Sequence, residues 1–438
     1  MDSKPRVLVL SRSAWDNTNN SGNTLSNLFK NWKKEDIANL YCRDELPDNQ
    51  ICTTYFKISE SLLIQKLFGK IEVAGRRFDH KEISGISISN QNEISFEKRI
   101  YNFFKANRWY VFLWLREFLW YIVNWKSKDL DEFVKSFQPE IIFAPSYDSF
   151  YMYKLLFHLK TISNAKIVVF HADDLVTYRQ KSYSPFFWIN RVILRNFITK
   201  LIINADKNYC IIDEQAEVYK HIYKKEFDLL YKSENFSHLP IYHSSGEILK
   251  MVYAGNIIYG RLESLIEISK VLKILNDPKK IIELDIYTAN EIKEKDRLTL
   301  KNSDSVNFKG KVSFQKIPQI LENADILLHV ESFQKKQMYL TALSFSTKLI
   351  DYFKMGKPLF ALGWEESASI KYLKKNDIGI TCTSFKNLEK DLRALLSNTS
   401  NFKTMGENIW FFGEKNHNQD KVLSEFENDL RSLIRKND

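Results

Sequence analysis

Short, mostly apolar runs alternate with segments of helical periodicity along almost the whole chain. In the first half, such runs at 6–10, 141–144, 166–171 and 208–212 each precede a segment in which apolar residues recur every three or four positions. This alternation predicts buried strands joined by helices, and therefore a parallel sheet covered by helices on both faces.

The same alternation resumes after residue 247. Strands are predicted there at 250–254, 282–287, 306–309, 326–330, 358–362 and 378–381. We therefore expect an α/β fold with two doubly wound Rossmann-like domains facing a cleft. The predicted bounds are 1–240 and 247–400, with C-terminal helices at 401–438 packing back across the junction.

Composition narrows the class of protein. The 438 residues allow two or three domains, and 44% hydrophobic with 14% aromatic residues exclude a disordered chain. The four cysteines form no C-x-x-C pair, which excludes a disulfide scaffold or zinc ribbon and indicates a reducing, cytoplasmic location. A net charge of +10 permits an anionic partner without choosing one.

The aromatic-rich stretch at 98–125 has two interpretations. Arg116 and Glu117 interrupt its most apolar part, so we do not expect a membrane-spanning helix. Basic and aromatic residues together favour peripheral membrane contact through 98–125. Alternatively, 110–125 is a buried helix of the first domain and only 98–109 touches the interface.

The richest chemistry follows a helix start in the second half, where ligands bind beyond strand ends in such folds. Ser346 or Thr347 can cap a helix whose free N–H groups, with Lys348, form an anion site. Asp351, one turn later, can accept hydrogen bonds from the vicinal hydroxyls of a ribose. The alternative is an ordinary capped helix in which Asp351 only favours the dipole.

The run S-T-K-L-I-D-Y-F-K-M-G-K-P at 346–358 resembles the donor-binding motif of GT-B glycosyltransferases. It is most similar to family-4-type enzymes that build bacterial capsule and surface polysaccharides. The family has two glutamates eight residues apart, and these positions here are Leu343 and Asp351. The resemblance implies that Asp351 binds the ribose hydroxyls and that a nucleotide-sugar serves as donor without a metal.

Three further segments fit this resemblance. Gly255 allows close approach of backbone to a ligand, and the resemblance gives Arg261 a diphosphate-binding role, the alternative being a surface helix residue. Backbone groups near Val312 would read the nucleobase. His329 and Glu331 end a buried strand and could line the cleft, although a strand-end histidine is more often structural.

In the first half, a polar loop at 13–23 with Gly22 and Asn23 resembles the family's loop near the donor phosphate and acceptor, or is an ordinary solvated loop. His171 ends a predicted strand and could position the acceptor or take its proton. Asp173 or Asp174 could orient His171 or do that work, or could simply be acids at a helix start.

Asp129 and Asp131 match the D-x-D metal signature of the other large glycosyltransferase fold. They lie in a helical pattern at 128–137, where positions i and i+2 do not share a face. We therefore expect no metal site there. Leaving-group stabilisation would fall to helix N–H groups, Arg261 and Lys348.

The sequence thus predicts a retaining, metal-independent glycosyltransferase. It would move a sugar from a nucleotide-sugar to a glycan or polyprenyl-linked acceptor in surface polysaccharide synthesis. Two alternatives remain open: a degenerate GT-B scaffold, motivated by Leu343, and a sugar-nucleotide epimerase using Glu331 and His329. Nucleic acid is not an expected partner, because no basic stripe is interleaved with aromatics outside 98–128.

Overall fold

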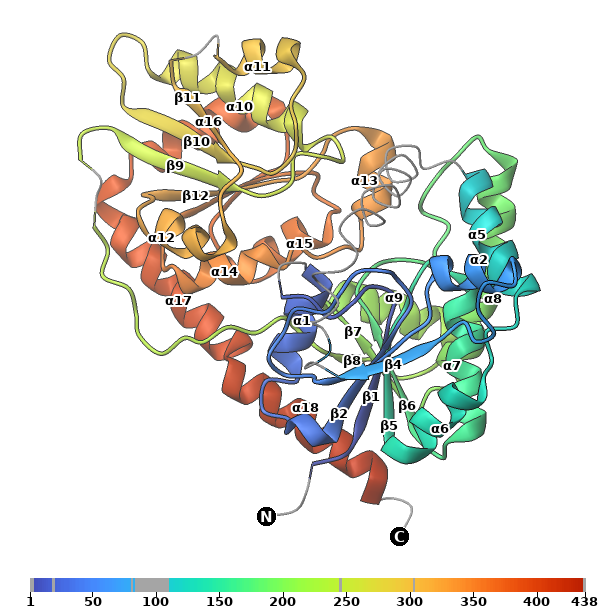
Figure 1. Ribbon diagram of the computed structural model, residues 1–438. Helices are drawn as coiled ribbons and strands as arrows, with labels where there is room; N and C mark the ends of the chain where they lie inside the picture. Colours follow the sequence, from blue (N-terminus) through green and yellow to red (C-terminus); the bar gives the residue numbers. More distant parts are fainter. Residues whose placement is uncertain are drawn as a thin grey trace. The chain divides into compact units, whose positions relative to one another are not determined.

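The computed structural model describes residues 4–17, 20–79, 82, 110–243, 246–301 and 304–435. It divides the chain into two compact α/β units, each built around its own sheet (Figure 1). Unit 1 comprises Met1–Thr177, Ser182–Leu230 and Leu423–Asp438, and unit 2 comprises Tyr178–Lys181 and Tyr231–Val422. The predicted pair of doubly wound sheets is confirmed, whereas the domain bounds 1–240 and 247–400 and the packing of 401–438 across the junction stay predictions.

Unit 1 is built on an eight-stranded sheet of order β4-β3-β2-β1-β5-β6-β7-β8. Its strands are β1 (Val7–Ser11), β2 (Ile37–Tyr41), β3 (Thr54–Lys57), β4 (Arg76–Asp79), β5 (Ile141–Pro145), β6 (Lys166–His171), β7 (Lys207–Cys210) and β8 (Asp228–Leu229). Only the β3–β4 pair is antiparallel. The strand order reverses between β1 and β5, which makes that point the topological switch of the sheet.

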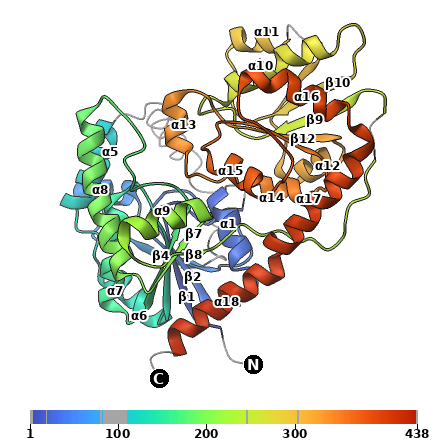
Figure 2. The same cartoon turned by 180° about the vertical axis from the view of Figure 1, so that it is seen from behind.

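Helices cover both faces of this sheet. They are α1 (Asn20–Leu28), α2 (Glu60–Leu67), α5 (Tyr110–Ile122), α6 (Lys128–Phe137), α7 (Phe150–Ile162), α8 (Pro185–Asn204), α9 (Asp213–Tyr223) and the greater part of α18 (Gln419–Arg435), with a 3₁₀ turn η1 (Lys34–Asp36). Helices α7 and α9 lie over the sheet in the reverse view (Figure 2).

Strand β1 is buried along its whole length, because it contributes to two cores. Leu8 and Leu10 belong to the core formed with α2 and α5 to α9. Successive side chains point to opposite faces, so Val7 and Val9 face the other side. There the ring of Phe426, on α18, lies 5.7 Å from Phe29 and 5.9 Å from Phe143.

Unit 2 has a six-stranded, wholly parallel sheet of order β11-β10-β9-β12-β13-β14. Its strands are β9 (Leu249–Ala254), β10 (Ile282–Tyr287), β11 (Val306–Gly310), β12 (Ile326–Val330), β13 (Leu359–Leu362) and β14 (Ile380–Cys382). This is the 3-2-1-4-5-6 order of a dinucleotide-binding fold, and its switch point lies between β9 and β12.

The helices of unit 2 enclose a separate core centred on β9, β10 and β12. They are α10 (Arg261–Leu275), α11 (Glu294–Lys301), α12 (Ile317–Glu322), α13 (Lys335–Thr341), α14 (Lys348–Lys354), α15 (Ala368–Lys375), α16 (Leu388–Leu396) and α17 (Phe402–His417), with the 3₁₀ turns η2 (Phe314–Lys316), η3 (Phe385–Asn387) and η4 (Thr399–Asn401).

The predicted strands are all present, with ends shifted by no more than two residues. Strand β2 was not predicted, because the polar Asn39 interrupts its apolar run. Asn39 is nevertheless buried, since its Nδ2 donates to the Val9 carbonyl at 3.0 Å and to Ser11 Oγ at 2.9 Å. A side chain that bonds across two strands can occupy a core position without breaking the strand.

One predicted loop is wrong. Residues 13–23 were expected to form a loop that includes Gly22 and Asn23, but α1 begins at Asn20, so both residues are helical. The reason is packing: a Cβ on Gly22 would overlap the backbone carbonyl of Asp16. Glycine here lets a helix approach the preceding segment rather than freeing a loop.

The aromatic stretch at 98–125 is described only in part. Residues 98–109 lie outside the described residues, and 110–122 form α5. Within the described ranges, no helix is both long enough and apolar enough to cross a membrane.

Candidate functional site

The switch point of unit 2 brings together residues that lie far apart in the sequence. Gly255 follows β9, Glu331 follows β12 and Arg261 opens α10. Arg261 donates from Nε and Nη2 to Glu331 Oε2, at 3.2 and 2.9 Å. This charge-assisted contact fixes the guanidinium at the carboxyl edge of the sheet.

Lys348 enters the same site from the start of α14. A Cβ added to Gly255 would lie 2.6 Å from Lys348 Nζ, so the bare glycine backbone makes room for the amine. The same nitrogen lies 4.2 Å from the centre of the Tyr253 ring, a cation–π distance. Gly255, Arg261, Glu331 and Lys348, all predicted candidates, therefore form one cluster.

The amine of Lys348 is the unusual group in this cluster. Its Nζ is buried and makes no hydrogen bond to any of the described residues. Burial, reinforced by the charge of Arg261, lowers the pKa of Lys348 to about 7, although Glu331 and Asp351 oppose the shift. A buried, half-ionised amine beside a guanidinium would gain most from an anion.

Glu331 is the buried carboxylate that binds Arg261 in this cluster. Its side chain is only 4% exposed, and the Nε2 of buried His329 lies 3.2 Å from its Oε1. Burial opposes ionisation, but Arg261 and His329 together lower the pKa of Glu331 to about 2. Glu331 is thus positioned to hold Arg261. Its predicted direct contact with the nucleotide-sugar donor stays a prediction.

The start of α14 offers fewer free donors than expected. The N–H groups of Leu349 and Ile350 donate to the carbonyls of Ser346 and Thr347, at 3.0 and 3.2 Å. The N–H of Ser346 donates to Ser369 Oγ at 3.0 Å. In the described structure the hydroxyl of Thr347 forms no capping bond. The anion-binding role of Ser346 and Thr347 therefore stays a prediction, and Lys348 is the stronger candidate.

Asp351 lies one turn into α14 and is already paired. Its carboxylate forms an ion pair and hydrogen bond with Lys232, whose Nζ also lies 3.6 Å from Glu234. Burial, opposed by Lys232 and supported by Glu234, raises the pKa of Asp351 to about 6. The side chain is still 35% exposed, so a ligand can reach it.

Lys232 and Tyr253 are the partners that sequence reasoning missed. Lys232 lies in a segment without periodicity, where an isolated lysine carries no signal. Tyr253 is an ordinary core position of β9 by its pattern. Val312 lies just beyond the edge strand β11 and is partly exposed, and its nucleobase role stays a prediction.

In unit 1, His171 is buried at the end of β6. It is 1% exposed, its Nε2 lies 3.4 Å from Asn208 Oδ1, and the Tyr219 and Phe227 rings pack against it. Burial, opposed by the Asn208 contact, lowers the pKa of His171 to about 4. This environment is that of a neutral core histidine, and its catalytic role stays a prediction.

The two acids after His171 differ in their environment. Asp174 Oδ1 accepts from the backbone N–H groups of Val176 and Thr177, at 3.1 and 2.9 Å, and its Oδ2 accepts from the Thr177 hydroxyl. These bonds close a local turn, which favours the structural interpretation of Asp174. Asp173 is exposed, and its carbonyl accepts from Gln215 at 3.0 Å.

The D-x-D sequence lies on a helix, as expected. Ser127 Oγ accepts from the N–H of Leu130 at 3.2 Å, which caps α6, and Asp131 lies 3.2 Å from His158. Across the part of the chain that the structure describes, no three His, Cys, Asp or Glu side chains gather as a metal site.

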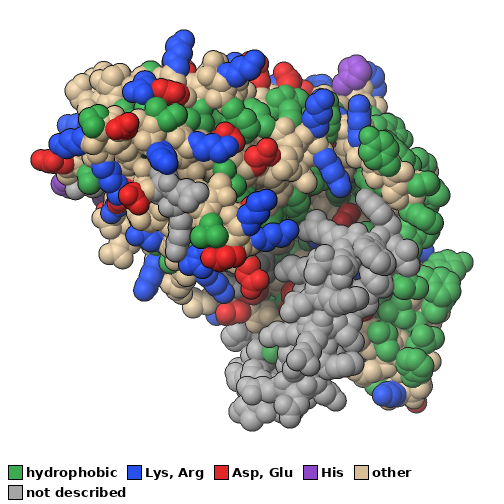
Figure 3. Space-filling view, turned by 90° about the horizontal axis from the view of Figure 1, so that it is seen from above, with side chains coloured by type: hydrophobic (Ala, Val, Ile, Leu, Met, Phe, Trp, Pro, Cys, Tyr) green, Lys and Arg blue, Asp and Glu red, His purple; other side chains and the backbone are tan. Residues whose placement is uncertain are grey.

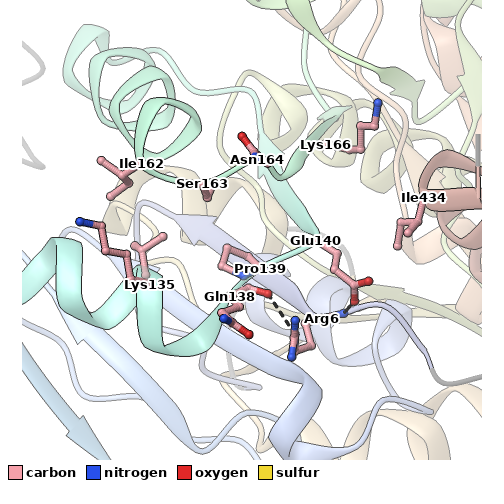
Figure 4. Close-up of a pocket in the computed structure, with 11 residues that line it drawn as sticks. Arg6, Lys135, Gln138, Pro139, Glu140, Ile162, Ser163, Asn164, Lys166 and Ile434 are labelled. Atoms are coloured by element: carbon pink, nitrogen blue, oxygen red, sulfur yellow. Dashed lines mark hydrogen bonds between the residues drawn. The ribbon is translucent and has the colours of Figure 1, made fainter. Parts of the chain in front are cut away.

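An open hollow of about 620 Å³ lies in unit 1, but at the other edge of the sheet (Figure 4). Arg6, Glu140 and Lys166, at the amino ends of β1, β5 and β6, help to line it. Arg6 Nε donates to the Gln138 carbonyl at 2.9 Å, and Lys166 lies 3.4 Å from Asp206. Arg6 and Lys166 are thus engaged, and ligands of α/β sheets bind at the opposite edge.

Neither a family model nor a curated protein sequence matches the chain. Solved structures do. HepE from Anabaena in complex with UDP superposes with a TM-score of 0.63 at 11% identity, over 98% of this chain and 100% of HepE. Sucrose-phosphate synthase from Thermosynechococcus elongatus gives 0.60 at 11%, with the same coverage.

A UDP-forming α,α-trehalose-phosphate synthase from Burkholderia vietnamiensis also gives 0.60 at 11% identity, over 98% of this chain and 100% of the synthase. Similarity at this level of identity establishes architecture over essentially the full length. Together with the two doubly wound sheets, it shows that the chain has the GT-B fold that its motif at 346–358 resembled.

Proposed function

We propose that the chain is a glycosyltransferase that uses a nucleotide-sugar donor. The observation that carries this proposal is the buried amine of Lys348, held beside Arg261 at the switch point of unit 2 and hydrogen-bonded to none of the described residues. A cation kept without a partner in a protein interior is destabilising by itself. A ligand diphosphate would supply the missing negative charge.

The donor diphosphate would contact Arg261 and Lys348, above the bare backbone of Gly255. As the bond to the sugar breaks, negative charge grows on the diphosphate, and the two cations stabilise that charge without a metal. Because Glu331 holds the guanidinium of Arg261, the geometry is ready before the donor binds. Retention of anomeric configuration belongs to this proposal and needs its own measurement.

The nucleotide would be UDP. HepE has been solved with UDP and with UDP-glucose, and the trehalose-phosphate synthase is UDP-forming. Asp351 would accept hydrogen bonds from the ribose hydroxyls and would exchange or share its contact with Lys232 when it does so. Val312 and its neighbours would meet the base through backbone groups.

The acceptor would be a glycan or a polyprenyl-linked sugar, handled near an anionic membrane surface in polysaccharide synthesis. Large apolar side chains are exposed on three helices of unit 1: Ile64 and Leu67 on α2, Leu115, Phe118, Tyr121 and Ile122 on α5, and Phe186, Ile189, Val192 and Ile203 on α8. We call these ten residues the apolar patch. Apolar side chains gather at this end of the molecule (Figure 3).

Charge around the apolar patch favours an anionic membrane over a protein partner. Helix α8 carries partly exposed Arg195, exposed Lys200 and no acidic residue, while its Arg191 is buried and paired with Asp174. Exposed Lys126 follows α5 directly. Basic residues beside exposed aromatics are typical of a surface that rests on anionic lipid. The proposed contact therefore extends the predicted segment 98–125 to α2 and α8.

The alternatives fit the geometry less well. An epimerase would need Glu331 and His329 free for proton transfer, yet Glu331 is bound to Arg261 and His329 is fully buried. A degenerate scaffold is favoured only by the buried, apolar Leu343 at the position of the family's first acid. The donor cluster itself is complete enough for binding a diphosphate.

The test is a thermal-shift screen with UDP, GDP, ADP and CMP, each with and without EDTA. A ligand present at one hundred times its dissociation constant adds about 2.7 kcal/mol of stability, which is easily detected. We expect UDP to give the largest shift, unchanged by EDTA. A UDP shift without release of UDP from UDP-sugars and acceptors would favour the scaffold. No shift with any nucleotide would contradict the proposed donor site.

A further inference from the structure

A second polar cluster lies at the switch point of unit 1, outside the residues singled out by the motif. Arg12 follows β1 and Asp148 follows β5, the two strands between which the order of the sheet reverses. The two side chains form an ion pair. In open α/β sheets this position is where ligands bind, and no predicted site residue occupies it.

Helix α5 brings a second guanidinium to the cluster. Arg116 Nη2 donates to Ser149 Oγ at 2.8 Å and lies 3.4 Å from Glu117 Oε1. Both oxygens of Glu117 are already used, because they accept the N–H groups of Phe150 and Tyr151 at 3.1 and 3.0 Å. Glu117 thus ties α5 to the start of α7 while it also pairs with Arg116.

Tyr151 lies at the centre of this arrangement. The Arg116 guanidinium is 5.5 Å from the centre of its ring, and Trp120 stacks on the ring at 4.1 Å. Burial alone would raise the pKa of Asp148, but Arg12 and Arg116 together lower it below its ordinary value. Both guanidinium groups therefore act on the same small volume.

The buried polar atoms that remain in this cluster are mostly donors. Arg12 Nε, Arg116 Nε and the hydroxyl of Tyr151 are buried without a hydrogen-bond partner among the described residues. Tyr151 is 1% exposed, whereas the side chain of Asp148 is 51% exposed, so the cluster is buried at one end and open to solvent at the other. An Nε–H group can only donate, and each unsatisfied buried donor is costly.

The missing partner must therefore bring acceptor oxygens, and two guanidinium groups favour a charged one. Asp148 is engaged by Arg12, and Glu117 by backbone N–H groups. The remaining carboxyl near Arg116 is Glu60, whose pKa is raised by burial although Arg116 opposes the shift. Asp148, Glu117 and Glu60 thus offset the charge of the two guanidinium groups, but none of them accepts from Arg12 Nε or Arg116 Nε.

We propose that Arg12, Arg116 and Tyr151 form a subsite for an anionic group of the acceptor, a carboxylate or phosphate carried on a sugar. The inference rests on the proposed function and narrows its substrate class: the acceptor is acidic. Tyr151 and the two Nε–H groups donate to the anion.

The test measures binding of small acceptor fragments to the full chain by saturation-transfer NMR, at fixed ionic strength and with saturating UDP. The probes are methyl glucuronide, its neutral match methyl glucoside, and glycerol phosphate. We expect an anionic probe to bind at least tenfold more tightly than methyl glucoside. Whether methyl glucuronide or glycerol phosphate binds better identifies the anion as carboxylate or phosphate.

Variants of Arg116 and Tyr151 test whether the anionic probe binds at this cluster. Arg116→Gln and Tyr151→Phe should each weaken the anionic probe about tenfold, since each removes a hydrogen bond to a charged group. Lys128→Gln, which removes an exposed charge at the start of α6, should leave binding unchanged. UDP binding is measured in parallel and should not change. If UDP fails to bind, the probes are titrated without UDP. The test of the acceptor subsite is therefore independent of the test of the donor site.

Tyr151→Phe carries a second readout. Because its hydroxyl is unpartnered among the described residues, the variant should melt at the same or a higher temperature without ligand. A lower melting temperature with unchanged probe binding would mean that the hydroxyl is structural. Equal binding of glucuronide and glucoside, no anionic binding at all, or variants that bind like the wild type would each overturn the proposal.

Discussion

The switch points of the two units are built from the same parts but differ in exposure. Each places an arginine from beyond its first strand beside a carboxylate that follows the adjacent strand: Arg12 with Asp148 in unit 1, and Arg261 with Glu331 in unit 2. Glu331 is almost fully buried, whereas half of the Asp148 side chain meets solvent. In unit 2, Arg261 is therefore held in place before a ligand binds. In unit 1, the pair of Arg12 and Asp148 remains accessible to solvent.

The chemistry around each pair differs as well. In unit 2 a bare glycine and a buried amine surround the guanidinium, which suits a compact polyanion such as a diphosphate. In unit 1 the Arg116 guanidinium lies over the buried Tyr151 ring, and the Nε–H groups of Arg12 and Arg116 lack acceptors, which suits a ligand group that brings acceptor oxygens. According to the two proposals, one sheet architecture would serve two ligand classes through the residues placed at its switch point.

The largest effect is expected from breaking the buried pair in unit 2. Arg261→Gln leaves the Glu331 carboxylate buried without its guanidinium, so the variant should lose about 3–5 kcal/mol of stability in chemical denaturation. It should also lose most UDP affinity. The double variant R261Q/E331Q is the matched control, and it should recover stability without recovering UDP binding. If both properties returned together, Arg261 would not contact the donor.

Asp351→Ala should give the second largest effect, a loss of UDP affinity. Loss of hydrogen bonds from ribose hydroxyls to a carboxylate is worth about 1.5–3 kcal/mol, or roughly ten- to a hundredfold in UDP affinity by calorimetry. Lys232→Met, which frees Asp351 from its present partner, should not weaken UDP to the same degree. Unchanged UDP affinity in Asp351→Ala would mean that the ribose lies elsewhere.

Lys348→Met should separate binding from stability. The pKa of Lys348 is lowered to about 7 in the folded protein, against about 10.4 in an unfolded chain. Between these values the unfolded chain binds the extra proton, so wild-type stability should rise as pH increases from 7 to 10. UDP affinity should fall over the same range, because the ammonium loses its charge.

In Lys348→Met both pH dependences should flatten, and the ligand-free protein should be more stable at pH 7 because a buried, half-ionised amine is gone. UDP affinity should fall about tenfold at pH 7. Denaturation and calorimetry across pH 6–10 test both effects. A variant that is less stable and keeps the UDP affinity of the wild type would contradict the role given to Lys348.

The smallest effect is expected at the apolar patch. Phe118→Ser and Phe186→Ser remove exposed rings from α5 and α8, and each should reduce sedimentation with phosphatidylglycerol vesicles several-fold without changing UDP affinity. Phe314→Ser removes an equally exposed ring from unit 2 and is the control. Equal losses in all three variants would remove the case for a membrane-facing patch.

Periodicity was enough to predict both sheets, because parallel strands buried on both faces read as apolar runs. It missed β2, where Asn39 Nδ2 donates inside the sheet, and β4, a polar strand at the edge. It also missed the short strands β3 and β8. It misplaced Gly22, since glycine can open a loop or let a helix pack closely, and only the contact with Asp16 distinguishes the two.

The candidates Gly255, Arg261 and Lys348 could be selected from the sequence, because they follow strand or helix ends that a motif makes visible, and their donor role stays a prediction. Lys232 could not be selected, since its role depends on a contact with Asp351 across more than a hundred residues of sequence. Arg116 was noticed only as a charge that interrupts an apolar helix. Its partners Ser149 and Tyr151 come from another element, and no local pattern connects them.

Calorimetry of UDP and UMP with the wild type and Lys348→Met, in EDTA at pH 7, tests the central claim most directly. The two nucleotides differ only by the phosphate that Lys348 and Arg261 are proposed to hold. We expect UDP to bind the wild type at least tenfold more tightly than UMP, and Lys348→Met to remove most of that difference. Equal affinities for UDP and UMP in the wild type would contradict a diphosphate site at Lys348.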